Sequence, residues 1–139
     1  MPRVGPRKLN DKTIHQLVAS LDAVLSEYTR RNWIIDEAGT VRCYTCDTAL
    51  HWKRSHCGHY IPRTESPTRH DERNLRPQCA GCNTFRSGMP HEYRRRLCDE
   101  IGADAVKDLE AESRVKWKWD RESLIEQITY YREALKEMS

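Results

Sequence analysis

Two Cys-x-x-Cys pairs constrain the fold of this chain more than any other feature of its sequence. The first pair is Cys43 and Cys46, the second is Cys79 and Cys82, and 32 residues lie between them. The surrounding segment 43–89 is rich in Cys, His, Gly, Pro and Arg but has no sustained hydrophobic period, so apolar burial alone cannot organise it. Four thiolates from two tight turns can close one tetrahedral zinc site. We therefore predict that a structural zinc ion holds this segment together.

A second ligand set is also open to the sequence. Cys57 and His59 could complete a site with the first pair, but that arrangement would leave the second Cys-x-x-Cys pair without a role. The sixth cysteine, Cys98, follows Leu97 in an expected helix, where a cysteine is most often a small buried apolar side chain. The four-cysteine site is the preferred prediction.

The rest of the composition supports metal binding rather than disulfide formation. No run of 18 apolar residues exists, and the first residues have no apolar stretch of the kind found in signal peptides. We therefore expect no membrane association and a reducing cytoplasm, where clustered cysteines usually bind metal. The chain is 37% hydrophobic and 32% charged, and a domain this polar gains stability from a metal staple.

The hydrophobic pattern indicates an α+β fold that is mainly helical. We expect a flexible arm over 1–9 and a single domain over 10–139. Within the domain, the pattern predicts an N-terminal helix in 10–35, a zinc-stapled core in 41–89 and C-terminal helices in 90–139.

Local signals set the expected element ends. Apolar residues at helical spacing span about 11–31, with Asn10 or Asp11 as the N-cap. A turn at 36–39 leads into a short strand near Val41. Helical patterns return at about 91–101 and 103–112, and a last helix follows an Asp120 cap.

Charge is distributed unevenly along the sequence. The whole chain carries a formal charge of +3, but residues 53–96 hold ten Lys and Arg against four Asp and Glu, a net charge of +6. A basic segment of this kind suits a polyanion, because Lys and Arg displace counterions from phosphates. DNA is the expected partner.

Residues 57–83 carry an ordered pattern of His and Asn. His59 is followed by Ile61 and Pro62, Asn74 leads into the second cysteine pair, and Asn83 directly follows it. This pattern resembles the HNH (ββα-metal) nuclease motif, in which a strand ending in His-x-x-Pro turns through a loop into a helix. A longer stretch, from about residue 28 to residue 109, resembles the NinG (Rap) family of lambdoid phages. The residues that carry this second resemblance are Cys43, Thr45, Cys46, Gly58, His59, Tyr60, Arg63, Glu72, Arg73, Asn74, Gln78, Cys79, Cys82, Asn83, Ser87, Gly88, Tyr93, Arg94, Leu97, Gly102, Leu109 and Glu110.

The resemblance implies a structure-specific endodeoxyribonuclease that acts on branched recombination intermediates such as Holliday junctions and D-loops. It also implies a ββα-metal core among helices and, for a phage-encoded chain, a bacterial host cytoplasm. The residue types fit this chemistry. A neutral histidine can accept a proton from water near pH 7, which makes His59 the expected general base. An asparagine oxygen suits Mg²⁺ or Mn²⁺, which makes Asn83 the expected catalytic metal ligand. Asn74 completes the expected catalytic set, as a residue that braces the loop.

One position departs from the common HNH pattern. Many HNH members have an aspartate directly before the histidine as a second metal ligand, and this chain has Gly58 there. Some relatives in the wider ββα-metal class have Asn as the only protein ligand, and His56, Asp71 or Glu72 could also supply a ligand here. The sequence does not choose among these alternatives.

The expected DNA contacts come from arginines crowded around the proposed centre. These are Arg63, Arg69, Arg73, Arg76 and Arg86. The alternative function is a non-enzymatic zinc-containing module that binds DNA or assists recombination, because it also requires zinc and a basic face. We further expect a homodimer, since two nicks resolve a two-fold symmetric junction. The candidate interfaces are the seam Leu124, Ile128, Tyr131, Leu135 and Met138, and the first helix with Leu17, Leu21 and Leu25.

Overall fold

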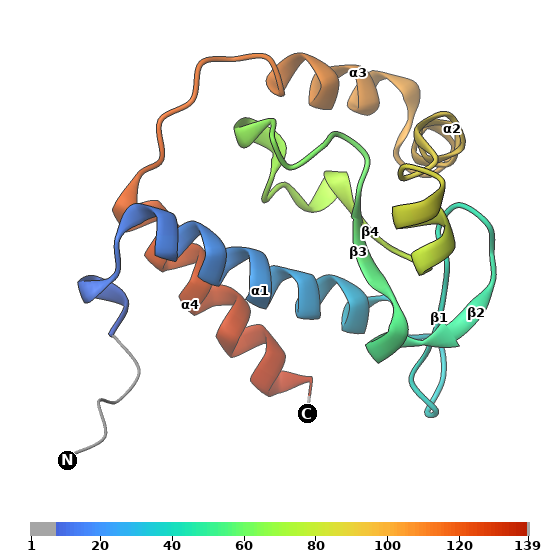
Figure 1. Cartoon of the computed structure of the whole chain (residues 1–139), viewed down its shortest axis with the longest axis horizontal. Coiled ribbons are helices and arrows are strands. Elements are labelled where there is room, and N and C mark those ends of the chain that lie inside the picture. Colours follow the sequence, from blue (N-terminus) through green and yellow to red (C-terminus); the bar gives the residue numbers. More distant parts are fainter. Residues whose placement is uncertain (1–7, 139) are drawn as a thin grey trace. The chain divides into compact units, whose positions relative to one another are not determined.

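The computed structural model describes residues 8–138 and has an α+β fold with two small antiparallel sheets (Figure 1). This confirms the predicted α+β class. The expected flexible arm over 1–9 lies mostly outside the described residues. In chain order the elements are η1 (Leu9–Asp11), α1 (Ile14–Asn32), β1 (Thr40–Arg42), β2 (Ala49–His51), η2 (Trp52–Arg54), β3 (His56–His59), η3 (Ser66–Thr68), η4 (Glu72–Asn74), β4 (Leu75–Gln78), η5 (Gly81–Phe85), α2 (Pro90–Ile101), α3 (Ala103–Glu112) and α4 (Arg121–Glu137).

The chain divides into two compact units. Of the described residues, one unit comprises 8–25 with 118–138, and the other comprises 26–117. The boundary falls inside α1, so the expected zinc core belongs wholly to the second unit. No helix within the described residues is long and apolar enough to cross a membrane.

The first unit contains the start of α1, whose cap differs from the sequence prediction. Asn10 and Asp11 lie in η1, so the prediction that one of them is the N-cap was wrong. Thr13 caps the helix instead: its hydroxyl accepts from the backbone N–H of Gln16 at 3.1 Å, and the Gln16 side chain accepts from the Thr13 N–H at 3.0 Å. This reciprocal capping box satisfies two backbone donors that the helix leaves unpaired. The helix then buries Leu17, Leu21 and Leu25.

The first unit also contains α4, which begins as the sequence predicted. The Asp120 carboxylate accepts from the backbone N–H of Ser123 at 2.9 Å. Along α4, Leu124, Ile128 and Tyr131 are buried. These residues and the leucines of α1 were predicted as candidate dimer interfaces. Their side chains are already buried within a single chain.

The second unit places both cysteine pairs at strand ends. The first pair occupies the turn between β1 and β2, which pair in antiparallel register. β3 and β4 form the second antiparallel pair, with His56 opposite Gln78 and His59 opposite Leu75. The second cysteine pair directly follows β4 and leads into η5. A backbone hydrogen bond of 2.9 Å from the Tyr44 N–H to the Pro77 carbonyl joins the first turn to β4.

A small core under α2 and α3 supports β3. Tyr93, Leu97 and Val106 are fully buried there, and the rings of Tyr44 and Tyr60 pack against them. The Tyr93 hydroxyl donates to the Gly58 carbonyl at 2.8 Å. Helix α2 is therefore tied to the middle of the strand that carries His59.

Candidate functional site

The four cysteines of the two pairs form one cluster. Their sulfur atoms all lie within 4.8 Å of one another, and the Cys46 and Cys79 sulfurs are 3.8 Å apart. A tetrahedral zinc with bonds of about 2.3 Å to sulfur places neighbouring sulfurs roughly 3.8 Å apart, so the geometry fits. These four cysteines can hold a structural metal such as zinc. Cys57 and His59, the alternative ligands, are not part of the cluster.

The environment of the cluster favours thiolate formation at one cysteine. Burial alone would raise the pKa of the Cys43 thiol, but hydrogen bonds from the backbone of Cys79, Thr45 and Cys46 and from the Thr45 hydroxyl lower it to about 6. Burial and the three neighbouring thiols raise the pKa of Cys79. A divalent cation would stabilise the four neighbouring sulfur atoms as thiolates, because it binds thiolates and displaces their protons.

A buried glutamine links the two cysteine turns. Gln78 has no exposed surface, and its side-chain amide nitrogen donates to the Thr45 hydroxyl at 3.1 Å and to the Gly88 carbonyl at 2.9 Å. A Cβ atom on Gly58 would lie 1.9 Å from the Gln78 Oε1 atom. An aspartate therefore cannot replace Gly58 unless Gln78 moves. Gln78 was named in the sequence only among the residues of the family resemblance, and its role in linking the two turns was not predicted, although its position directly before the second pair was a signal.

His59 lies at the end of β3 and is half-buried. Its Nε2 atom is 3.1 Å from the backbone carbonyl oxygen of Arg69. A carbonyl only accepts hydrogen bonds, so this contact requires the ring proton on Nε2. In the neutral ring, Nδ1 is then the basic nitrogen. The protein thus selects one tautomer and orients one basic nitrogen.

Asn74 shapes the loop that carries the Arg69 carbonyl. Its side chain is fully buried and accepts from the Ile61 N–H at 2.7 Å while donating to the carbonyls of Ile61 at 2.9 Å and Thr68 at 3.2 Å. These three hydrogen bonds tie both ends of the 61–68 loop to η4. Asn74 therefore braces this loop through hydrogen bonds to its backbone, as its place in the motif predicted.

Asn83 lies against the other end of β3. Its Nδ2 atom is 3.0 Å from Nδ1 of His56. His56 and His59 are the first and last residues of β3, so their Cα atoms lie about 10 Å apart at the usual rise of a strand. The structure thus pairs Asn83 with His56 and anchors His59 separately, on the Arg69 carbonyl.

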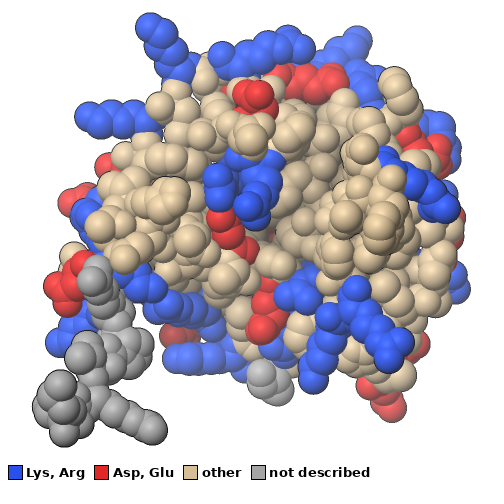
Figure 2. Space-filling view, viewed as in Figure 1, with Lys and Arg blue, Asp and Glu red and all other residues tan. Residues whose placement is uncertain are grey.

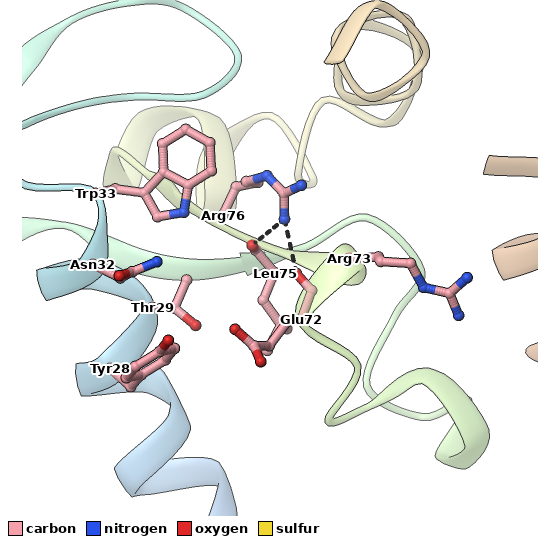
Figure 3. Close-up of a pocket in the computed structure, with 8 residues that line it drawn as sticks. All are labelled: Tyr28, Thr29, Asn32, Trp33, Glu72, Arg73, Leu75 and Arg76. Carbon is pink, nitrogen blue, oxygen red and sulfur yellow. Dashed lines mark hydrogen bonds between the residues drawn. The ribbon is translucent and has the colours of Figure 1, made fainter. Parts of the chain in front are cut away.

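Arg76 is held inside the protein rather than presented to solvent. Its guanidinium makes two hydrogen bonds of 3.2 Å to the Glu100 carboxylate and lies over the rings of Trp33 and Tyr44. It also donates to the carbonyls of Glu72 and Leu75 at 2.8 and 2.7 Å, which Figure 3 shows as dashed lines. Beside it is a cavity of about 240 Å³ (Figure 3), lined by Tyr28, Thr29, Asn32, Trp33, Glu72, Arg73, Leu75 and Arg76.

Acidic partners neutralise several other arginines of the basic segment. Arg73 binds the Asp71 carboxylate through two hydrogen bonds and also contacts Glu112. Arg94, Arg95 and Arg96 likewise pair with carboxylates. Figure 2 accordingly shows acidic side chains interspersed among basic ones on the viewed face. The exposed cations Lys53, Arg54, Arg63 and Arg86 form no ion pair with a carboxylate within residues 8–138.

Comparison with known proteins identifies relatives of the chain. The family model described as "Bacteriophage Lambda NinG protein" matches residues 4–139. The protein named "Protein ninG" of Salmonella phage P22 is 32% identical over 99 residues, which cover 69% of this chain and 47% of that protein. "Protein ninG" of Escherichia phage lambda is 31% identical with the same coverage. That of Enterobacteria phage H19B is 38% identical over 72 residues, or 50% of this chain and 34% of its own.

The chain spans about half the length of the curated relatives it matches. No solved structure matches it.

Proposed function

The chain belongs to the NinG family of phage proteins, and on that premise we propose that it is an HNH-like DNA endonuclease. In this proposal it hydrolyses phosphodiester bonds with the help of a divalent metal ion. Its substrates are branched recombination intermediates such as Holliday junctions and D-loops.

The contact between His59 and the Arg69 carbonyl is the single observation that carries the proposal. A general base needs a fixed tautomer and a defined orientation, and this hydrogen bond of 3.1 Å supplies both. Asn74 supports the contact indirectly, because it fixes the loop that leads to Arg69. His59 can then accept a proton from the attacking water at Nδ1. A purely structural zinc module has no need for such an arrangement.

Asn83 is the proposed protein ligand of the catalytic metal. Its Nδ2 atom contacts His56, so its Oδ1 atom points away from that ring. An amide oxygen is a hard neutral ligand that suits Mg²⁺ or Mn²⁺. The metal, when bound, stabilises negative charge on the phosphate and on the leaving oxygen. The order β3, β4, η5 supports the proposal, because a strand–strand–helix order is typical of the ββα-metal motif, although η5 is a short π-helical turn.

The predicted arginines differ in how accessible they are to DNA. Arg63 and Arg86 are exposed and remain the best of the predicted phosphate contacts, together with Lys53 and Arg54. Arg76 is almost fully buried and already engaged with Glu100. Contact between Arg76 and DNA would break interactions that hold α2 to β4.

Cleavage of a synthetic four-way junction and a matched linear duplex, each with and without Mg²⁺, tests the proposal. We expect nicks in the junction that require Mg²⁺ and that chelation abolishes. Slower cleavage of the duplex would support a preference for branched DNA. Binding without cleavage of either substrate, under any divalent metal, would instead support the non-enzymatic zinc module.

We further propose that the active form is a homodimer, because two opposing nicks require two active sites. Most of the apolar residues first considered for its interface are already buried in one chain, whereas Leu135 and Met138 are only partly buried. Light scattering with and without junction DNA tests this proposal. A monomer in both conditions would contradict it.

A further inference from the structure

Phe85 is the most exposed large apolar side chain among the described residues. It is the only phenylalanine of the chain, and 82% of its surface is accessible to water. The next most exposed, Tyr130 at 63%, carries a hydroxyl that water can solvate. An exposed phenyl ring gains nothing from folding, and its exposed face is available to bind a ligand.

The backbone that carries Phe85 is firmly held. The Arg86 N–H donates to the Gly81 carbonyl at 2.9 Å, and the Gly88 N–H donates to the Cys82 carbonyl at 2.8 Å. The buried Gln78 side chain donates to the Gly88 carbonyl. Phe85 thus ends a helical turn that starts inside the cysteine cluster. An aromatic ring on such a fixed support loses little conformational entropy when it binds.

Backbone strain distinguishes the same segment. Ser87 and Met89 have φ values of 54° and 52°, which non-glycine residues rarely adopt. η5 itself is a π-helical turn. Positive φ values at non-glycine residues and π-helical turns both cost free energy. In proteins both occur most often at functional sites that require a special backbone geometry.

The neighbourhood of Phe85 is cationic and polar. Arg86 directly follows Phe85, and Lys53 and Arg54 precede β3, whose first residue, His56, contacts Asn83 two residues before Phe85. No Asp or Glu occurs in 53–63 or in 79–91. A docking surface for another protein needs a contiguous apolar patch, whereas Thr84, Arg86 and Ser87 around this ring are polar. A lone aromatic ring among cations is typical of contact with an exposed nucleobase.

We propose that Phe85 stacks on an unpaired or unstacked nucleobase at a DNA branch point and so selects branched DNA over continuous duplex. The proposal rests on the proposed function in that DNA is the substrate. In a continuous duplex every base face is covered by its neighbours, so the ring finds no partner there. At a branch point the stack is interrupted, and a base face can be offered to the phenyl ring while nearby cations contact the phosphates.

Binding measurements without cleavage test this role. Wild type, Phe85→Ala and Phe85→Trp are compared at one salt concentration, in chelator-free buffer without Mg²⁺, on a four-way junction and a matched duplex. Tyr130→Ala is the control for loss of an exposed aromatic ring. We expect Phe85→Ala to weaken junction binding about tenfold, within the range of base stacking on aromatic side chains, and to change duplex binding less than about twofold. Phe85→Trp should retain junction binding, and its added fluorescence should change on binding the junction only.

The outcomes separate this inference from the nuclease proposal. Junction affinity unchanged in Phe85→Ala, with zinc content equal to wild type, would overturn the inference alone. A shift in oligomeric state without DNA, at unchanged DNA affinity, would show a protein contact and would also overturn it. Weakened junction binding in a protein that never cleaves would support the inference and contradict the nuclease. Absence of DNA binding by wild type would overturn both.

Discussion

The side-chain amide of Asn83 lies against the imidazole of His56, with Nδ2 of the asparagine 3.0 Å from Nδ1 of the histidine. In the neutral ring, Nδ1 accepts this hydrogen bond when the ring proton is on Nε2. The contact then distinguishes the two ends of the amide, because only the nitrogen can donate. His56 thereby acts as a positioning residue in the proposed nuclease: it holds Asn83 with its oxygen directed away from the ring.

A double-mutant cycle tests this relationship. Asn83→Ala should reduce cleavage strongly, with partial rescue at high Mg²⁺ concentration, because the metal loses a ligand. His56→Ala should raise the Mg²⁺ concentration needed for half-maximal cleavage, since the amide is no longer oriented. In an Asn83→Asp background, His56→Ala should have a smaller effect, because a carboxylate offers oxygen on either side. Equal effects of His56→Ala in both backgrounds would argue against the positioning role.

Loss of the general base should remove cleavage without disturbing the fold. We expect His59→Ala to lower the single-turnover rate on a junction by about 10²–10⁴-fold, while zinc content and junction affinity stay near wild type. His91→Ala, at an exposed position of α2, is the matched control and should cleave normally. Full activity in a pure His59→Ala preparation would exclude His59 as the base.

The sequence was sufficient to predict the features that depend on local patterns. The structure confirms two predicted helices, at 91–101 and 103–112, and the predicted Asp120 cap. It also confirms the clustering of Cys43, Cys46, Cys79 and Cys82. Capping, periodicity and ligand spacing can all be recognised in short segments of sequence. The cap of α1 was misplaced because several capping residues, Asn10, Asp11 and Thr13, stand close together. Only the structure shows that Gln16 completes the box with Thr13.

Contacts between distant residues could not be predicted. Nothing in the sequence indicates that Gln78 fills the space above Gly58, or that the Arg69 carbonyl meets His59. Charge pattern was also an incomplete guide, because the positive segment 53–96 is partly neutralised by α2 and α3, whose Glu100, Glu110 and Glu112 lie next to its arginines. Such pairings depend on tertiary packing rather than on spacing.

The cysteine cluster predicts a defined metal content. Protein purified without chelators should contain one zinc per chain, and serine at any of the four clustered positions should empty the site and destabilise residues 43–89. Cys57→Ser and Cys98→Ser are matched controls that should keep the zinc, because neither sulfur belongs to the cluster. Metal analysis with circular dichroism measures both effects. Loss of zinc in Cys57→Ser would favour the alternative ligand set.

Asn74 should contribute stability through its three buried hydrogen bonds. Asn74→Ala leaves the Ile61 N–H and two carbonyls without their partner, and an unsatisfied buried group costs about 1–3 kcal/mol. Asn74→Asp should be at least as harmful, because it places a carboxylate oxygen against the carbonyls of Ile61 and Thr68. Urea unfolding of both variants measures the change. A stability near wild type for Asn74→Asp would show that the loop does not depend on this residue.

The hydrogen-bonded cluster of Tyr60, Arg94 and Glu110 should make the free energy of unfolding depend on pH in the acidic range. The Glu110 carboxylate accepts from the Tyr60 hydroxyl at 2.7 Å and from Arg94 at 3.0 and 3.1 Å, and the hydrogen bonds from Arg94 hold its pKa below the ordinary value of 4.5. Because the folded chain favours the ionised form, this contribution to the free energy of unfolding is complete above pH 4.5 and is lost as the pH falls through the lowered pKa. Glu110→Gln should therefore be less stable than wild type at pH 7, and the difference should shrink below pH 4.5. Urea unfolding at a series of pH values, with Glu126→Gln on α4 as the control, measures this difference. If the difference in the free energy of unfolding between wild type and Glu110→Gln stayed constant from pH 7 to pH 3, the charge of the Glu110 carboxylate would not contribute to stability.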